Sequence, residues 1–89
     1  TFRVTCTTSS QALAALIGTS IPVGATTCEI QADGGSIRLR RDGNTPTSTI
    51  GYRIDDGVEK MVDTALADVR LISAGGASVF ANVIFFDRV

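Results

Sequence analysis

The chain has 89 residues, and 8 Lys and Arg stand against 9 Asp and Glu, so its formal net charge is −1. A near-neutral chain has no overall field that would attract nucleic acid or an anionic membrane surface, and no apolar run is long enough to cross a bilayer. We therefore expect a single globular domain over residues 1–89, with neither nucleic acid nor a membrane as its partner.

The residue composition argues against catalysis and metal binding. The chain contains no His, so it lacks the usual base for chemistry near neutral pH. No Ser lies in a nucleophile motif, and Asp55 and Asp56 are adjacent on a predicted turn, where neighbouring side chains point apart. We therefore predict a non-enzymatic protein with no catalytic residue, no metal and no cofactor.

The two cysteines are far apart in the sequence. Cys6 and Cys28 have no metal-ligand spacing, and each occupies an apolar position of an alternating run. This pattern predicts two buried free thiols in a chain that folds in a reducing cytoplasm. A disulfide between them is the alternative.

The N-terminal run predicts a strand followed by a short helix. Apolar and polar residues alternate over residues 2–7, which is typical of a half-buried strand. Thr8 and Gln11 are spaced as a capping box, and apolar residues at helical spacing follow them. Gly18 can end the helix in the left-handed conformation. We expect this helix over about residues 9–17.

The middle of the chain predicts a hairpin and a loop. Apolar and polar residues alternate on both sides of the Asp-Gly-Gly run at residues 33–35, where glycine accepts positive φ. We therefore expect residues 26–41 to form a β-hairpin. Polar residues 42–48 predict a loop, because Pro46 disfavours strand pairing, and extended structure resumes over residues 49–54.

The basic residues of this hairpin are the main candidate for function. On a strand, Arg38 and Arg40 project from one face and Arg41 from the other. Cross-strand pairing with Glu29 and Gln31 would make these arginines structural. Contact with another protein chain would make them functional, whereas nucleic-acid binding would need more positive charge and exposed aromatic residues.

The C-terminal third leaves alternatives open. Apolar residues in 57–69 fit helical spacing, and the competing interpretation is a strand at 58–62, a single turn around 64–67 and a strand at 68–73. The final strand, residues 77–86, is apolar on both faces. Its residues Phe80, Ile84, Phe85 and Phe86 either pack in the core or form an apolar seam with another subunit.

Three motifs are distributed over nearly the whole chain. They are Val-Thr-Cys-Thr-Thr near the N-terminus, IQA-x-GG-x-IR-x-R-x-DG-x-x-PT over residues 30–47, and DVRLI over residues 68–72. The chain resembles, in these motifs and their order, the small β-rich structural proteins of tailed bacteriophages. The resemblance implies strands and not a helix after Asp56. We therefore expect an all-β fold, a small β-sandwich or jelly-roll-like barrel with one short helix after the first strand.

The resemblance also implies a function on the virion. We expect a capsid decoration or cement protein that assembles in the bacterial host cytoplasm, forms a homo-oligomer, with a trimer favoured, and binds the major capsid protein or another virion protein. The expected partner-contact residues are Arg38, Arg40, Arg41, Asp42, Asn44, Thr45 and Phe86. The alternative is a receptor- or glycan-contacting module of a tail fibre or spike, for which Tyr52 near Asp55 and Asp56 offers the one aromatic grouping.

Overall fold

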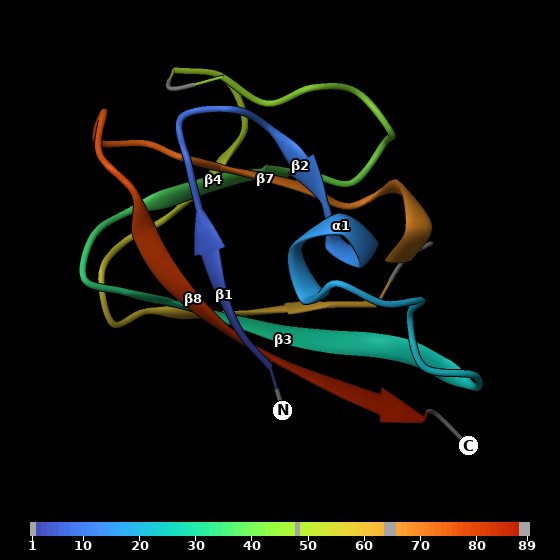
Figure 1. The fold of residues 1–89 in the computed structure, drawn as a ribbon. Helices are drawn as coiled ribbons and strands as arrows, with labels where there is room; N and C mark the ends of the chain where they lie inside the picture. The colour runs from blue at the N-terminus through green and yellow to red at the C-terminus, as the bar shows by residue number, and fades with distance from the viewer. Residues whose placement is uncertain (1, 48, 64–65, 88–89) are drawn as a thin grey trace.

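A computed structural model describes residues 2–47, 49–63 and 66–87 of the chain as an eight-stranded β-sandwich (Figure 1). The elements are β1 (Phe2–Cys6), β2 (Gln11–Ala12), α1 (Leu13–Ile17), β3 (Ala25–Asp33), β4 (Ile37–Arg40), β5 (Tyr52–Ile54), β6 (Glu59–Val62), the 3-10 turn η1 (Leu66–Asp68), β7 (Arg70–Ser73) and β8 (Val79–Asp87). One antiparallel sheet has the strand order β1-β8-β3-β6, and the other has the order β2-β7-β4-β5. The predicted β-sandwich with one short helix near its start is confirmed.

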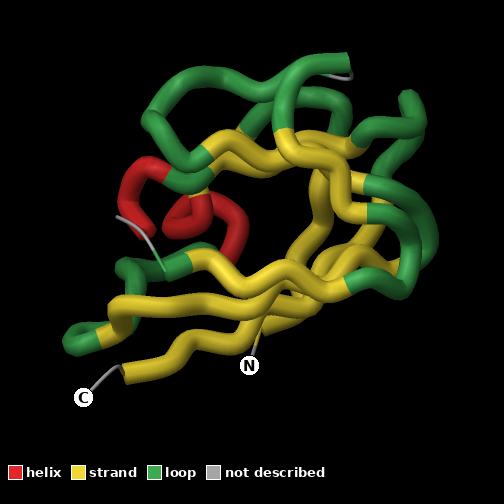
Figure 2. Tube along the Cα trace, turned by 180° about the vertical axis from the view of Figure 1, so that it is seen from behind, coloured by secondary structure: helices red, strands yellow, loops and turns green. Residues whose placement is uncertain are grey.

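The strands pair in nested order, the first with the last and the second with the second last. β1 pairs with β8, β2 with β7, β3 with β6 and β4 with β5, each in antiparallel register. The chain crosses between the sheets at every connection except the one from β4 to β5. This is the strand order of a jelly roll. The two layers are separate in Figure 2, and α1 lies at one end between them.

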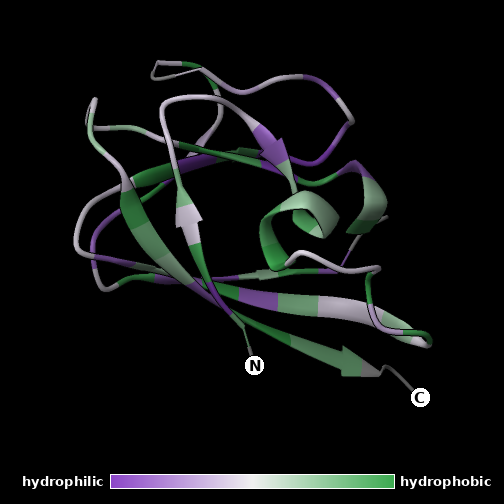
Figure 3. Cartoon of the chain, in the orientation of Figure 1, coloured by the Kyte–Doolittle hydropathy of each residue, from purple (hydrophilic) through white to green (hydrophobic). Residues whose placement is uncertain are grey.

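The core lies between the two sheets. Alternate residues of each strand point inward, so that Ile30 and Ala32 of β3 face Ile37 and Leu39 of β4 across the sandwich, all at most 2% exposed. β8 is hydrophobic along most of its length (Figure 3). Val79, Ala81 and Val83 of β8 point inward and are buried, whereas Phe80 and Phe86 on its other side are 44% and 41% exposed. Core packing is therefore the wrong interpretation for these two phenylalanines.

The predicted hairpin over residues 26–41 is wrong, because β3 and β4 lie in different sheets. Residues 33–35 form a crossover turn, in which Gly34 has a φ of 91° and donates its N–H to Asp56 Oδ1 at 2.9 Å. Alternation identifies the apolar face of each strand but not its neighbour. The two apolar faces oppose each other across the core and do not continue within one sheet.

The helix is shorter than predicted over residues 9–17. α1 begins at Leu13, and no side chain caps its N-terminus, so the capping box of Thr8 and Gln11 is wrong. Gln11 belongs to β2 and pairs with β7. Its backbone therefore takes part in the sheet and not in a longer helix. The predicted C-terminal end is confirmed, since Gly18 has a φ of 75°.

The strand interpretation of residues 57–69 is confirmed over the described residues. β6 pairs with β3 and β7 pairs with β4, so pairing in the two sheets outweighs the helical spacing of the apolar residues. η1 forms the later part of the predicted turn at 64–67, and residues 64–65 lie outside the described residues. Residue 48 of the predicted 42–48 loop lies outside them as well.

Both cysteines are free and buried in the core, as predicted. Cys6 is 1% exposed and Cys28 is 0% exposed. Burial raises the pKa of each thiol from its ordinary 9.0 to about 11, because the apolar surroundings disfavour the thiolate.

We expect neither thiol to react with a thiol reagent at pH 8 while the protein is folded, and two thiols per chain to react after denaturation. The pKa of each thiol is higher in the folded protein than in the unfolded chain. Each thiol therefore contributes stability that is fully present below pH 9 and is lost as the pH rises through about 11. Thermal melts between pH 8 and 11, compared with a Cys28→Ala variant, measure this loss. The absence of reactive thiols after denaturation would show a disulfide instead.

Candidate interaction site

The loop between β4 and β5 positions the predicted site residues. In Figure 1 it arches over β4 and β7, on the outer side of the β2-β7-β4-β5 sheet. Pro46 of this loop is buried, and Gly51 at its end lies against the carbonyl oxygen of Leu39 and the Cβ of Arg38. Arg38 donates from Nη1 to the Gly51 carbonyl at 2.9 Å. This contact therefore ties the loop to the sheet.

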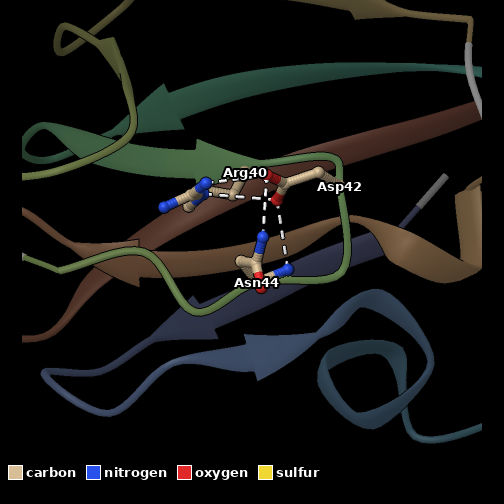
Figure 4. Close-up of polar contacts among 3 residues, drawn as sticks. All are labelled: Arg40, Asp42 and Asn44. Atoms are coloured by element: carbon tan, nitrogen blue, oxygen red, sulfur yellow. Dashed lines mark hydrogen bonds and ion pairs between the residues drawn. The ribbon is translucent and has the colours of Figure 1, made fainter.

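Arg40, Asp42 and Asn44 form a hydrogen-bonded cluster at the start of the loop (Figure 4). Arg40 donates from Nε to Asp42 Oδ1 at 3.2 Å and from Nη2 to Oδ2 at 2.7 Å. Asn44 donates its backbone N–H to Oδ1 at 3.1 Å and its Nδ2 to Oδ2 at 3.0 Å. These bonds, that from Arg40 above all, hold the pKa of Asp42 well below its ordinary 3.8. The bidentate contact fixes the direction of the guanidinium.

A cleft of about 460 Å³ lies beside this cluster. We call it the basic cleft, and its main lining residues are Arg40, Arg41, Asp42, Ile50, Tyr52 and Lys60. Three cations face one carboxylate there, and that carboxylate is already bonded to Arg40. Ile50 and Tyr52 are 55% and 54% exposed. The basic cleft is therefore suited to a partner with both negative charge and apolar surface.

Lys60 joins the two sheets at the rim of the basic cleft. Its Nζ lies 4.6 Å from the centre of the Tyr52 ring, so β6 of one sheet meets β5 of the other through a cation–π contact. Sequence reasoning missed Lys60 as a site residue. The available sequence signal is alternation: Lys60 stands two residues before Val62, which is buried, at a position where an apolar residue would be the ordinary choice.

The predicted contact residues do not all meet. Arg40, Arg41 and Asp42 line the basic cleft, and Asn44 is bonded to Asp42. Thr45 lines a different hollow on the outer side of the sheet, between the loop and β7. Arg38 binds the loop backbone, as described above. Phe86 lies on the outer face of the opposite sheet, in register with Thr27 of β3.

The predicted cross-strand pairing of the arginines with Glu29 and Gln31 is wrong. β4 lies between β7 and β5, so Arg38 is in register with Arg53, and Arg40 is in register with Arg70. These arginines have other partners: Arg53 donates from Nε to Asp55 Oδ1 at 2.7 Å, and Arg70 donates from Nε to Ser10 Oγ at 3.0 Å. Glu29 and Gln31 belong to the other sheet.

The aromatic grouping considered for a glycan also separates in the structure. Tyr52 lines the basic cleft, where its carboxylate neighbour is Asp42. Asp55 accepts from Arg53, and Asp56 accepts from the Gly34 N–H, so both carboxylates have other partners.

Neither a metal centre nor a membrane-spanning helix is found in the part of the chain that the structure describes. No group of three or more His, Cys, Asp or Glu residues there could hold a metal ion, and no helix there is long and apolar enough to span a bilayer. Comparisons with protein-family models, with curated proteins and with solved structures find no match for this chain.

Proposed function

We propose that this protein is a non-enzymatic structural component of a tailed-bacteriophage virion, which decorates or cements the head as an oligomer. The observation that carries the proposal is the basic cleft, because it presents Arg41 and the Arg40 guanidinium beside exposed Ile50 and Tyr52. Arg and Tyr are enriched at the centres of protein–protein interfaces. A protein surface is therefore the partner that this site fits best.

The fold and the size of the chain support the same proposal. The jelly-roll strand order recurs in viral capsid domains. It recurs in lectins as well, so the fold is an analogy and the site must carry the argument. A small domain gains avidity when it binds a surface that repeats one geometry, as a phage head does. The motifs that resemble those of phage structural proteins agree with this role.

We expect Arg40→Ala to weaken binding to the particle while leaving the fold intact. Truncation of an interfacial arginine costs about 2 kcal/mol or more in binding, roughly a 30-fold loss of affinity. The ion pair with Asp42 is solvent-exposed, and such pairs contribute about 0–1 kcal/mol to folding. Occupancy on particles that lack the protein, after addition of each purified variant, measures the first effect, and thermal melting measures the second.

Arg53→Ala is the matched control for this experiment. Arg53 also pairs with an aspartate two residues later at 2.7 Å, but it does not line the basic cleft. Its variant should occupy the particle like the wild type. Unchanged occupancy for Arg40→Ala would contradict the contact, and a large fall in its melting temperature would show that the arginine is structural. Binding to a host glycan without binding to the head would favour the tail-fibre alternative.

A further inference from the structure

The outer face of the β1-β8-β3-β6 sheet carries acidic and apolar side chains together. We call it the acidic face, and the residues that matter are Glu29, Asp33, Glu59, Met61, Phe80 and Phe86. Register places them on one side of the sheet, because Glu29 pairs with Met61, Asp33 pairs with Phe80, and Glu59 pairs with the outward Gln31. Met61 is 48% exposed, and the two phenylalanines are 44% and 41% exposed.

The negative charge of the acidic face is only partly neutralised within the chain. Asp33 pairs with Arg3 at 3.1 Å, and this guanidinium also lies 4.3 Å from the Phe80 ring centre. Among the described residues, Glu29 and Glu59 have no cationic partner and instead interact with each other. Partial burial and the Glu59 carboxylate raise the pKa of Glu29. A cation from another molecule would relieve this repulsion.

The basic cleft has the complementary excess. Arg40 is paired with Asp42, whereas Arg41 and Lys60 have no carboxylate partner among the residues described. Two cations therefore remain in the basic cleft, and two carboxylates remain on the acidic face. Both surfaces are also apolar: of the seven large hydrophobic side chains that are most exposed, Ile50 and Tyr52 belong to the cleft and Met61, Phe80 and Phe86 to the face.

We propose that the acidic face of a second copy of this chain occupies the basic cleft, so that copies join head to tail. The inference rests on the proposed function and deepens it: the cleft joins the copies of the oligomer that binds the head, so Arg40→Ala weakens particle binding by weakening the oligomer and its avidity. Cleft and face are different surfaces of one chain, so the contact is heterologous, and it closes into a ring when the rotation between copies permits. A cyclic trimer is one such ring. Opposite charges align the two surfaces, while the exposed apolar residues supply the buried area.

Charge reversal on each surface tests the proposal with purified protein alone. The variants are Arg41→Glu in the cleft and Glu59→Lys on the face, both at exposed positions. Sedimentation velocity at micromolar concentration should show wild-type oligomers. Each variant by itself should associate at least about tenfold more weakly, because like charges then oppose each other. Arg53→Glu, a reversal at an exposed position of β5 that lines neither surface, should associate like the wild type.

Mixing the two variants separates head-to-tail contact from other modes. Each chain then offers a surface that the other needs, so an equimolar mixture, in which the two variants alternate, should associate more tightly than either component alone. The double variant Arg41→Glu/Glu59→Lys should regain association with itself. If a circular-dichroism melt shows either reversal to be unfolded, Arg41→Ala and Glu59→Gln replace it, with a smaller loss expected.

Three outcomes would overturn the proposal. The first is a wild type that stays monomeric up to a protein concentration of about 100 μM, well above the micromolar range of weak specific interfaces. The second is a charge reversal that does not change the association, and the third is a mixture of the two variants that fails to associate. A monomeric chain whose Arg40→Ala variant still loses particle occupancy would leave the proposed function standing. A chain that self-associates but never binds particles would support the head-to-tail contact and contradict the proposed function.

Discussion

Replacing Ile37 with alanine is expected to lower the free energy of unfolding by about 2–5 kcal/mol. Ile37 is 0% exposed and lies in β4 opposite the equally buried Ile54. Its truncation removes apolar contact and leaves a cavity that close-packed neighbours fill only in part. A domain of this length has a total stability of about 4–13 kcal/mol, so the variant loses a large share of it. Urea denaturation monitored by circular dichroism measures the difference.

Ile50→Ala is the matched control, since the same side chain is 55% exposed there. Its truncation should change the free energy of unfolding of the monomer by no more than about 0.5 kcal/mol. Equal losses at the two positions would contradict the placement of β4 with its Ile37 side in the core.

Replacing Gly51 with alanine is expected to cost about 2–3 kcal/mol. Gly51 has a φ of 131°, a conformation that residues with a side chain rarely adopt. A Cβ there would also lie 3.0 Å from the Leu39 carbonyl oxygen and 3.3 Å from the Cβ of Arg38. The substitution therefore strains the loop and pushes it away from the sheet. The same denaturation experiment measures the loss.

Gly57→Ala controls for backbone conformation alone. Gly57 has a φ of 81°, and a Cβ added to it would meet nothing within 4 Å. We expect a cost of about 1 kcal/mol, the ordinary penalty for the left-handed region. If Gly51→Ala costs no more than Gly57→Ala, the close approach of the loop to β4 is wrong.

The sequence predicts where the strands lie along the chain better than it predicts which strands pair with each other. Alternation identifies β1 and its inward side, because a period of two reports burial directly, whereas β8 is apolar on both faces and its inward side cannot be assigned from the sequence. It does not say which strands pair, and residues 26–41 show the consequence: two alternating runs with Gly between them suit a hairpin and a crossover equally. In a jelly roll the second outcome dominates, because six of its seven connections pass between sheets.

The candidate site is predictable in its local part. The Arg40–Asp42–Asn44 cluster spans five residues, so short-range spacing is enough to suggest it. The meeting of Lys60 with Tyr52 depends on how the sheets stack, and no local pattern contains that information. The sequence also does not show that Glu29 lies in a different sheet from Arg38 and Arg40, because strand pairing is not a local property. Stacking of the sheets thus determines the basic cleft, and strand pairing determines the acidic face.

The copy number of this protein in purified virions tests the central claim most directly. Under the proposed virion role, quantitative mass spectrometry of phage particles purified from a lysate that contains the protein should find it in a fixed ratio to the major capsid protein, as expected for a component that repeats over the head. A few copies per particle would place it on a spike or fibre instead. Its absence from washed particles, while the protein is present in the lysate, would contradict the account.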